Sequence, residues 1–148
     1  MKKVWLAGVL MVSGWVWAHD GGHGPKFEES AQQGGVLAGV IELKDAKLGP
    51  EAVLVYKAEL VRLEDGTVKV YLYNLSMKPL DLKKFDKTAK AALVTMAKKK
   101  TRTSKFMLEL QDGAFVGKAP KAATKPFNLD VVLIEGKRSL LAPFENLD

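Results

Sequence analysis

Both histidines of the chain lie close together, at His19 and His23, in a glycine-rich stretch that follows an apolar run. If the chain is cut before His19, that residue presents an α-amine and an imidazole, which can chelate one metal ion. His23 can add a second imidazole, and Asp20 or Glu28 can add an oxygen. Such a ligand set suits Cu(II), Ni(II) or Zn(II), with Cu(II) the tightest on intrinsic affinity. The predicted metal ligands are therefore His19, His23 and Asp20.

The alternative is that cleavage exposes a polar tail in which the two histidines are incidental. The spacing differs from the terminal copper motif that needs histidine at position three, because here histidine would stand at positions one and five. The distant second histidine of the copper-brace oxygenases is also lacking, so their chemistry is not expected. Met77, Met96 and Met107 are scattered in apolar patterns, which favours packing over Cu(I) ligation.

Residues 1–18 have the features of a secretory signal peptide. Two lysines precede an apolar run of 14 residues in which Ser13 is the one polar residue. Val16 and Ala18 supply small side chains at the −3 and −1 positions, so we expect cleavage after Ala18. The run is shorter than the roughly 20 residues that span a bilayer, and no later segment is longer. A periplasmic or secreted protein without a membrane span is predicted.

Composition argues against several classes of function. Of the 23 Lys and Arg residues, two lie in the signal, which leaves 21 against 17 Asp and Glu. This excess is modest, and an exported protein is not expected to meet nucleic acid. Its one tight cluster, residues 98–100, is predicted to be a solvated turn. The chain has no cysteine, so no thiol can act as a nucleophile or as a soft metal ligand.

An enzyme is the least expected class of protein. After His23 there is no histidine, which removes His-assisted serine or cysteine catalysis from the rest of the chain. Two carboxylate pairs, Glu59 with Asp65 and Glu109 with Asp112, are interpreted as an outward strand residue and a turn residue each. No phosphate-binding glycine loop or zinc-protease helix motif is present.

The predicted elements divide the chain into a signal (1–18), a flexible His/Gly-rich arm (19–34) and one domain (35–148). The arm has four glycines and little apolar surface to offset its ordering entropy. In the domain, short apolar runs between turn signals predict strands over 35–43, 53–63, 68–74, 88–96, 103–111, 114–118, 127–135 and 138–144. Residue pairs 65–66, 112–113 and 136–137 predict hairpin turns.

Seven to eight strands without a long helix are typical of an antiparallel β-sandwich of immunoglobulin-like shape. Residues 75–87 form a connection whose apolar side chains are predicted to pack back on this body. Pro143 is expected at an edge or at the end of the last strand. All three tryptophans lie in the signal, so the predicted core aromatics are Tyr56, Tyr71 or Tyr73, Phe106, Phe127 and Phe144.

The order of features resembles that of small periplasmic proteins and domains associated with heavy-metal efflux membrane-fusion subunits. The shared features are a His/Gly arm, the Gly34-Gly35 pair opening a strand, a Tyr-x-x-Glu-Leu strand (56–60) and a Val-x-Val-Tyr-Leu-Tyr strand (68–73). Phe-x-Gly-Lys at 115–118, Gly-Lys at 136–137 and Phe144 resemble the hairpins of that group. Members often carry histidine where Gln33 and residues 57–58 stand here, so the resemblance leaves the arm as the ligand donor.

Two functions are therefore predicted. The first is a non-enzymatic periplasmic accessory protein that binds or hands over a divalent metal, copper first, through the arm, with an envelope protein or a metal-efflux component as partner. The second is a structural or interaction module of the cell envelope with no metal role, which docks a partner through edge strands or the loop over 75–85.

Overall fold

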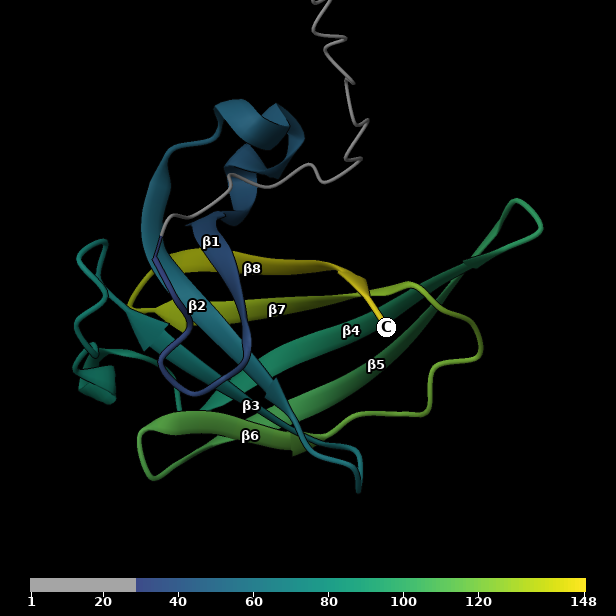
Figure 1. The fold of residues 1–148 in the computed structure, drawn as a ribbon. Coiled ribbons are helices and arrows are strands. Elements are labelled where there is room, and N and C mark those ends of the chain that lie inside the picture. The colour runs from purple at the N-terminus through teal and green to yellow at the C-terminus, as the bar shows by residue number, and fades with distance from the viewer. Residues whose placement is uncertain (1–28) are drawn as a thin grey trace, which may run out of the picture.

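The computed structural model describes residues 29–148. These residues contain eight strands and two short 3₁₀ helices (Figure 1). In chain order the elements are β1 (Val36–Glu42), η1 (Leu43–Glu51), β2 (Leu54–Arg62), β3 (Thr67–Tyr73), η2 (Leu82–Lys84), β4 (Thr88–Ala97), β5 (Lys100–Gln111), β6 (Ala114–Lys118), β7 (Phe127–Glu135) and β8 (Arg138–Leu147). The predicted signal peptide and the predicted ligands His19, Asp20 and His23 lie outside the described residues.

The strands close into one antiparallel barrel in the order β1-β2-β3-β6-β5-β4-β7-β8. The predicted all-β class and strand number are confirmed, but the predicted immunoglobulin-like sandwich is wrong. A sandwich keeps its two sheets unbonded to each other. Here β3 is hydrogen-bonded to β6, β4 to β7 and β1 to β8, so each sheet edge continues into the next strand.

Alternation along the strands fills the barrel interior. On β3, Val68, Val70 and Leu72 point inward and are buried, as the sequence pattern predicted. Phe127 and Phe144 are buried in the same core, also as predicted. Tyr56 and Phe106 are only partly buried, and the fully buried Phe115 was not among the predicted core aromatics.

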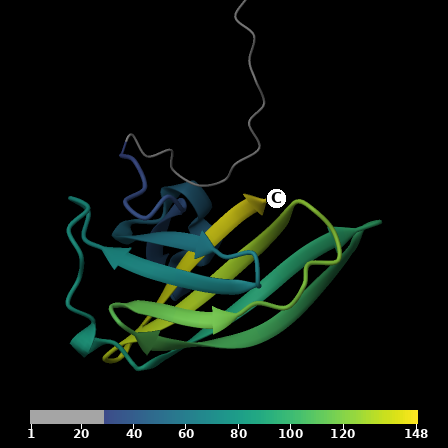
Figure 2. The same cartoon turned by 60° about the horizontal axis from the view of Figure 1, so that its bottom comes forward.

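The connection between β3 and β4 covers one end of the barrel (Figure 2). Its buried side chains, Met77, Leu82 and Phe85, confirm that this connection packs back on the body. The Phe85 ring lies edge-on to Phe115, with ring centroids 6.5 Å apart. Because β3 and β4 are not neighbours in the barrel, this connection must cross from one side to the other.

Two predictions about methionine are wrong. Met96 is 71% exposed and Met107 is 51% exposed, so neither packs into the core. Both stand on the outer face of the β4–β5 hairpin, where alternation turns their side chains away from the interior. No helix among residues 29–148 is long and apolar enough to cross a membrane.

Candidate functional site

The N-terminal anchor consists of residues 29–35 held against the outer face of β2 and β3. Its centre is the Glu59 carboxylate. Oε1 accepts the backbone N–H groups of Gln33 and Gly35, each at 2.8 Å, and Oε2 accepts that of Gln32 at 2.9 Å. The Tyr73 hydroxyl donates to Oε2 at 3.1 Å. Four donors thus saturate one buried carboxylate and fix the chain where it enters β1.

A second set of contacts extends the anchor toward Glu29. The Lys57 ammonium lies 2.6 Å from Glu29 Oε1 and donates to the Leu75 carbonyl at 3.0 Å. The hydrogen bond from Lys57 lowers the pKa of the Glu29 carboxyl. The Gln32 side chain donates from Nε2 to the Met77 carbonyl at 2.6 Å. Residues 29–35 therefore bridge β2 and the loop that follows β3.

The interpretation of Glu59 as an ordinary outward residue is wrong. The alternation of β2 does direct it outward, opposite to the core residues Ala58 and Leu60, but its side chain is 0% exposed. A carboxylate is fully buried only when its acceptor sites are satisfied. The covering segment belongs to the range predicted as a flexible arm, so the strand pattern alone gave no sign of this burial.

Tyr73 lies beside Glu59 on the same outer face and is 2% exposed. Burial, followed by the hydrogen bond to Glu59, raises the pKa of the Tyr73 hydroxyl to about 12. The phenol is therefore held as a neutral donor, which matches its role of completing the shell around the carboxylate.

The other carboxylates of the two pairs considered in the sequence, Asp65, Glu109 and Asp112, are exposed, as predicted. Asp65 lies in the β2–β3 turn, where it accepts from the Thr67 N–H at 2.9 Å. Among residues 29–148, no group of three His, Cys, Asp or Glu side chains is placed to hold a metal ion.

A polar cluster at the end of β7 has its charges matched within the fold. Glu135 accepts from the Tyr56 hydroxyl at 2.7 Å and from Arg138 Nη2 at 2.6 Å. Lys84 Nζ lies 3.3 Å from the same carboxylate and 5.1 Å from the Tyr56 ring centroid. Burial raises the pKa of Glu135, but these three donors outweigh it and leave the pKa lowered. The cluster is a local tie between η2, β2, β7 and β8.

The barrel is least closed between β1 and β8. Two residue pairs, Ile41 with Leu141 and Glu42 with Leu140, join these strands. Pro143 lies two residues beyond Leu141, pairs with β7, and has no backbone N–H to offer β1. This agrees with the edge position predicted for the proline. Residues 36–40 of β1 therefore pair with β2 on one side and with no strand of the described chain on the other.

A groove of about 420 Å³ runs along this open edge, and we call it the seam groove. Its lining residues are Val36, Leu37, Ala38, Gly39, Ile41, Ala46, Gly49, Pro50, Ala52, Leu54, Asn128, Asp130, Leu141, Pro143, Glu145 and Asn146. The charged residues of this lining are both acidic, Asp130 and Glu145. Burial, and then repulsion from Glu145, raises the pKa of the Asp130 carboxyl.

No family model, no curated protein and no solved structure matches the chain. The resemblance to efflux-associated periplasmic proteins therefore stays a prediction that rests on the sequence features alone.

Proposed function

We propose that this protein is a non-enzymatic accessory protein of the periplasm that binds or hands over a divalent metal, Cu(II) first, on its N-terminal segment. The observation that carries the proposal is the N-terminal anchor. Three backbone N–H groups of residues 32–35 converge on the buried Glu59 carboxylate. The segment that carries His19, Asp20 and His23 thus continues directly from a point fixed on the barrel.

Chain geometry limits how far the predicted ligands can lie from that point. His23 is six residues before Glu29, so it reaches at most about 22 Å from it at 3.3–3.6 Å per residue. A metal held by His19, Asp20 and His23 would be offered near β2 and the loop after β3. The barrel would supply position and stability, and the segment would supply the ligands.

Titration of the processed chain with Cu(II) tests this proposal. We expect tight binding by protein that begins at His19, and affinity at least tenfold lower for His19→Ala and for His23→Ala. One glycine added before His19 keeps both imidazoles but separates the α-amine from the first, so it should also weaken binding. Equal affinity in all of these proteins would refute the proposal. Mass spectrometry of the exported protein establishes where the chain begins.

A magnetic resonance experiment tests the fixed position. Bound Cu(II) is paramagnetic, so we expect it to broaden backbone resonances near Lys57 and Leu75. The resonances of Lys99, at the tip of the β4–β5 hairpin, serve as the internal control and should stay sharp. Broadening spread evenly over the barrel would contradict presentation from the anchor.

The seam groove favours a second candidate function, an interaction module that binds an extended basic peptide. The free edge of β1 over 36–40 offers backbone pairing along about 17 Å, at 3.3 Å per residue. Asp130 supplies a matching negative charge in the lining. We expect a Val-Lys-Val-Lys-Val peptide to bind and a Val-Glu-Val-Glu-Val peptide not to bind.

Matched carboxylate variants test the groove. Asp130→Asn should weaken binding of the lysine peptide at least tenfold. Glu64→Gln removes the same charge from an exposed turn and should leave binding unchanged. Equal weakening by both variants would show a general charge effect and would exclude the groove.

A further inference from the structure

The β4–β5 hairpin extends beyond the barrel as a two-stranded ribbon (Figure 1). Ten residue pairs join its strands, from Thr88 with Glu109 to Ala97 with Lys100. The neighbouring strand β7 accompanies β4 only as far as Thr95. Past that point the ribbon has no other strand beside it. Lys98 and Lys99 form the tip turn, with φ angles of 47° and 65°.

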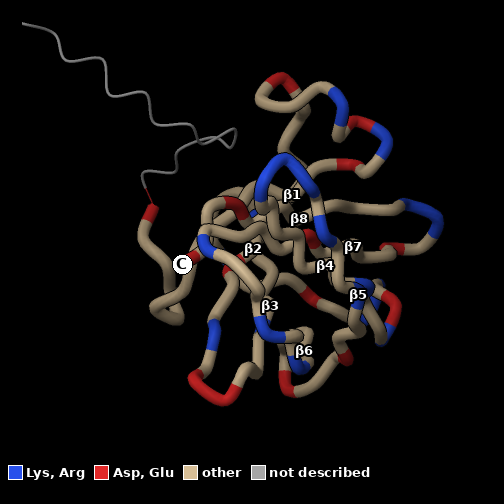
Figure 3. The backbone as a smooth tube through the Cα atoms, turned by 90° about the vertical axis from the view of Figure 1, so that its right-hand side faces the viewer, with Lys and Arg blue, Asp and Glu red and all other residues tan. Residues whose placement is uncertain are grey.

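Positive charge is concentrated on this hairpin. The hairpin, residues 88–111, carries six Lys or Arg and one acidic residue, Glu109, at its barrel end. The basic residues are Lys90, Lys98, Lys99, Lys100, Arg102 and Lys105, all exposed. None of them forms an ion pair with a described carboxylate, whereas Lys44, Lys57, Lys84, Lys118 and Arg138 all do. In Figure 3 the tip faces the viewer as a blue loop.

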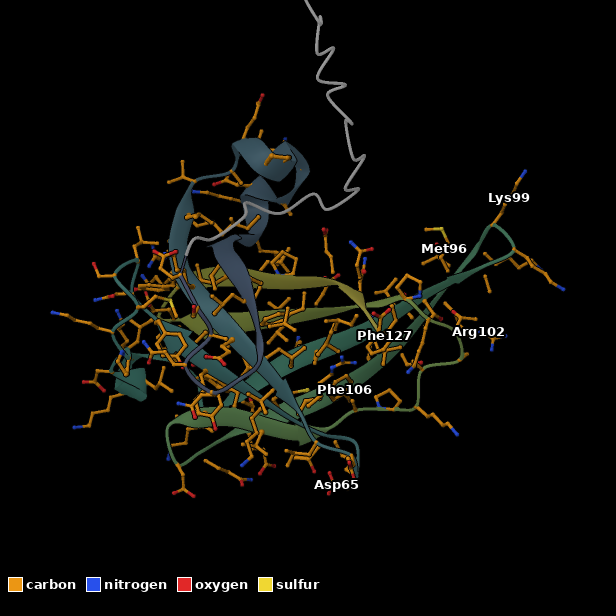
Figure 4. The ribbon with its side chains drawn as sticks, viewed as in Figure 1. Asp65, Met96, Lys99, Arg102, Phe106 and Phe127 are labelled. Carbon is orange, nitrogen blue, oxygen red and sulfur yellow. The ribbon has the colours of Figure 1, made fainter. Side chains whose placement is uncertain are left out.

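Apolar side chains stand among these cations. Met96 is 71% exposed beside the tip turn, and Met107 is 51% exposed farther down the ribbon. Alternation along β4 places Ala92 and Val94 on the same outer face as Met96. Figure 4 shows Met96 and Lys99 at the projecting end of the hairpin, and Arg102, which pairs with Thr95, at its base on the other face. A protruding tip thus combines an unburied thioether with the ammonium groups of residues 98–100.

We propose that this hairpin binds an anionic lipid surface, tip first. Lys98, Lys99 and Lys100 would contact headgroup phosphates, while Met96 would enter the boundary between headgroups and acyl chains. Basic residues beside exposed apolar ones are the combination that adsorbs to anionic bilayers, because the apolar part inserts and the charged ends stay at the interface. The occupant is therefore a phospholipid surface rather than a folded partner.

The structure favours lipid over nucleic acid as the polyanion. Binding of single strands uses aromatic side chains on which bases stack. The tip from Met96 to Arg102 has no aromatic residue, and the ring beside its base, that of Phe127 opposite Thr95, is buried in the core. A narrow convex tip also suits a broad deformable surface, into which it can press, better than a duplex groove.

Vesicle co-sedimentation of the chain without residues 1–18 tests the proposal. We expect binding to phosphatidylcholine vesicles that contain phosphatidylglycerol, weak binding to pure phosphatidylcholine, and weaker binding at high salt. Each lysine near such a surface strengthens partitioning about fivefold. The triple variant Lys98→Gln, Lys99→Gln and Lys100→Gln should therefore bind the anionic vesicles about 100-fold more weakly. Met96→Ser should reduce binding several-fold and leave the salt dependence unchanged.

A charge-matched control separates the hairpin from net charge. Lys47→Gln, Lys78→Gln and Lys137→Gln remove three exposed cations from other parts of the barrel. This control should retain most of the vesicle binding, and urea unfolding should show that both triple variants stay folded. Equal losses in the two triple variants would overturn the proposal. So would unchanged binding by Met96→Ser with equally strong binding of duplex DNA, since a purely electrostatic partner would then explain both results.

Discussion

The Tyr73 hydroxyl and the Glu59 carboxylate meet 3.1 Å apart on the outer face of the barrel. Neither side chain points into the core, yet they are 2% and 0% exposed. Residues 29–35 create this burial by covering the face and donating backbone N–H groups to the same carboxylate. The outer face of β2 and β3 around Glu59 and Tyr73 is thus a buried polar region. Its burial depends on the segment of chain that precedes β1.

Glu59→Gln should destabilise the protein by about 2–4 kcal/mol, because hydrogen bonds to a charged group are lost and a buried donor is left facing other donors. The amide nitrogen of the new side chain would replace one acceptor oxygen. Urea unfolding measures the change, and hydrogen exchange at Gln32 and Gln33 should become faster. Glu109→Gln, on the exposed face of β5, should change stability by less than about 0.5 kcal/mol. Similar results for both variants would show that the anchor does not stabilise the fold.

The two adjacent glycines of the anchor should respond differently to substitution. A Cβ on Gly35 would overlap the Leu60 carbonyl oxygen, whereas one on Gly34 would meet nothing within 4 Å. Gly34 has φ +73°, which costs an L-residue about 1 kcal/mol. We expect Gly34→Ala to lower the free energy of unfolding by about 1 kcal/mol. Gly35→Ala should cost about 2–3 kcal/mol, because backbone must shift. Equal unfolding free energies for the two variants would contradict the close packing of β1 on β2.

Tyrosine titration should report the anchor directly. Burial and the hydrogen bond to Glu59 raise the pKa of Tyr73 to about 12, above its ordinary 10.0. The folded state therefore holds this proton more tightly, so the stability it contributes is complete below pH 10 and is lost as the pH rises through 12. Phenolate absorbance should show a step near pH 12 that Tyr73→Phe removes. A spectrum without that step in the original protein would refute the burial of Tyr73.

The β2–β3 turn should show the opposite pH dependence. Hydrogen bonds from the Thr67 N–H and hydroxyl, and then from Lys118, lower the pKa of Asp65 to about 2. The stability from this ionised carboxylate is present above the ordinary value of 3.8 and is lost as the pH falls through 2. Carboxyl resonances should place this titration near pH 2. The Asp65→Asn variant should lose less stability than the original protein as the pH falls. An equal loss in both proteins would contradict the stabilising role of the ionised Asp65.

Local patterns in the sequence determined the individual strands. Alternation in β3 and Asp-Gly at residues 65–66 predicted the first hairpin, and Asp-Gly and Gly-Lys pairs predicted two more, because a tight turn and a half-buried face are encoded within a few residues. All three hairpins are present in the structure. The same alternation of buried and exposed residues occurs in sandwiches and in barrels, so it does not distinguish them. The predicted sandwich was therefore wrong although its strands were right.

Pairing between distant strands decided what the local pattern left open. The contacts of β3 with β6, β4 with β7 and β1 with β8 close the barrel, and no short-range signal specifies them. Burial of Glu59 follows from residues 29–35 folding over an outward face, whereas Met96 stands on an outward face of β4 and is 71% exposed.

The sequence by itself determined the residue types available for chemistry, including two histidines confined to positions 19 and 23 and no cysteine. It also determined the strand boundaries to within a few residues. Only the tertiary structure decided which outward faces are covered, where an edge stays free, and that six cations without an ion pair to a described carboxylate share one hairpin. Those properties depend on which elements meet in space, and that meeting is set by packing over the whole chain rather than by any single stretch of it.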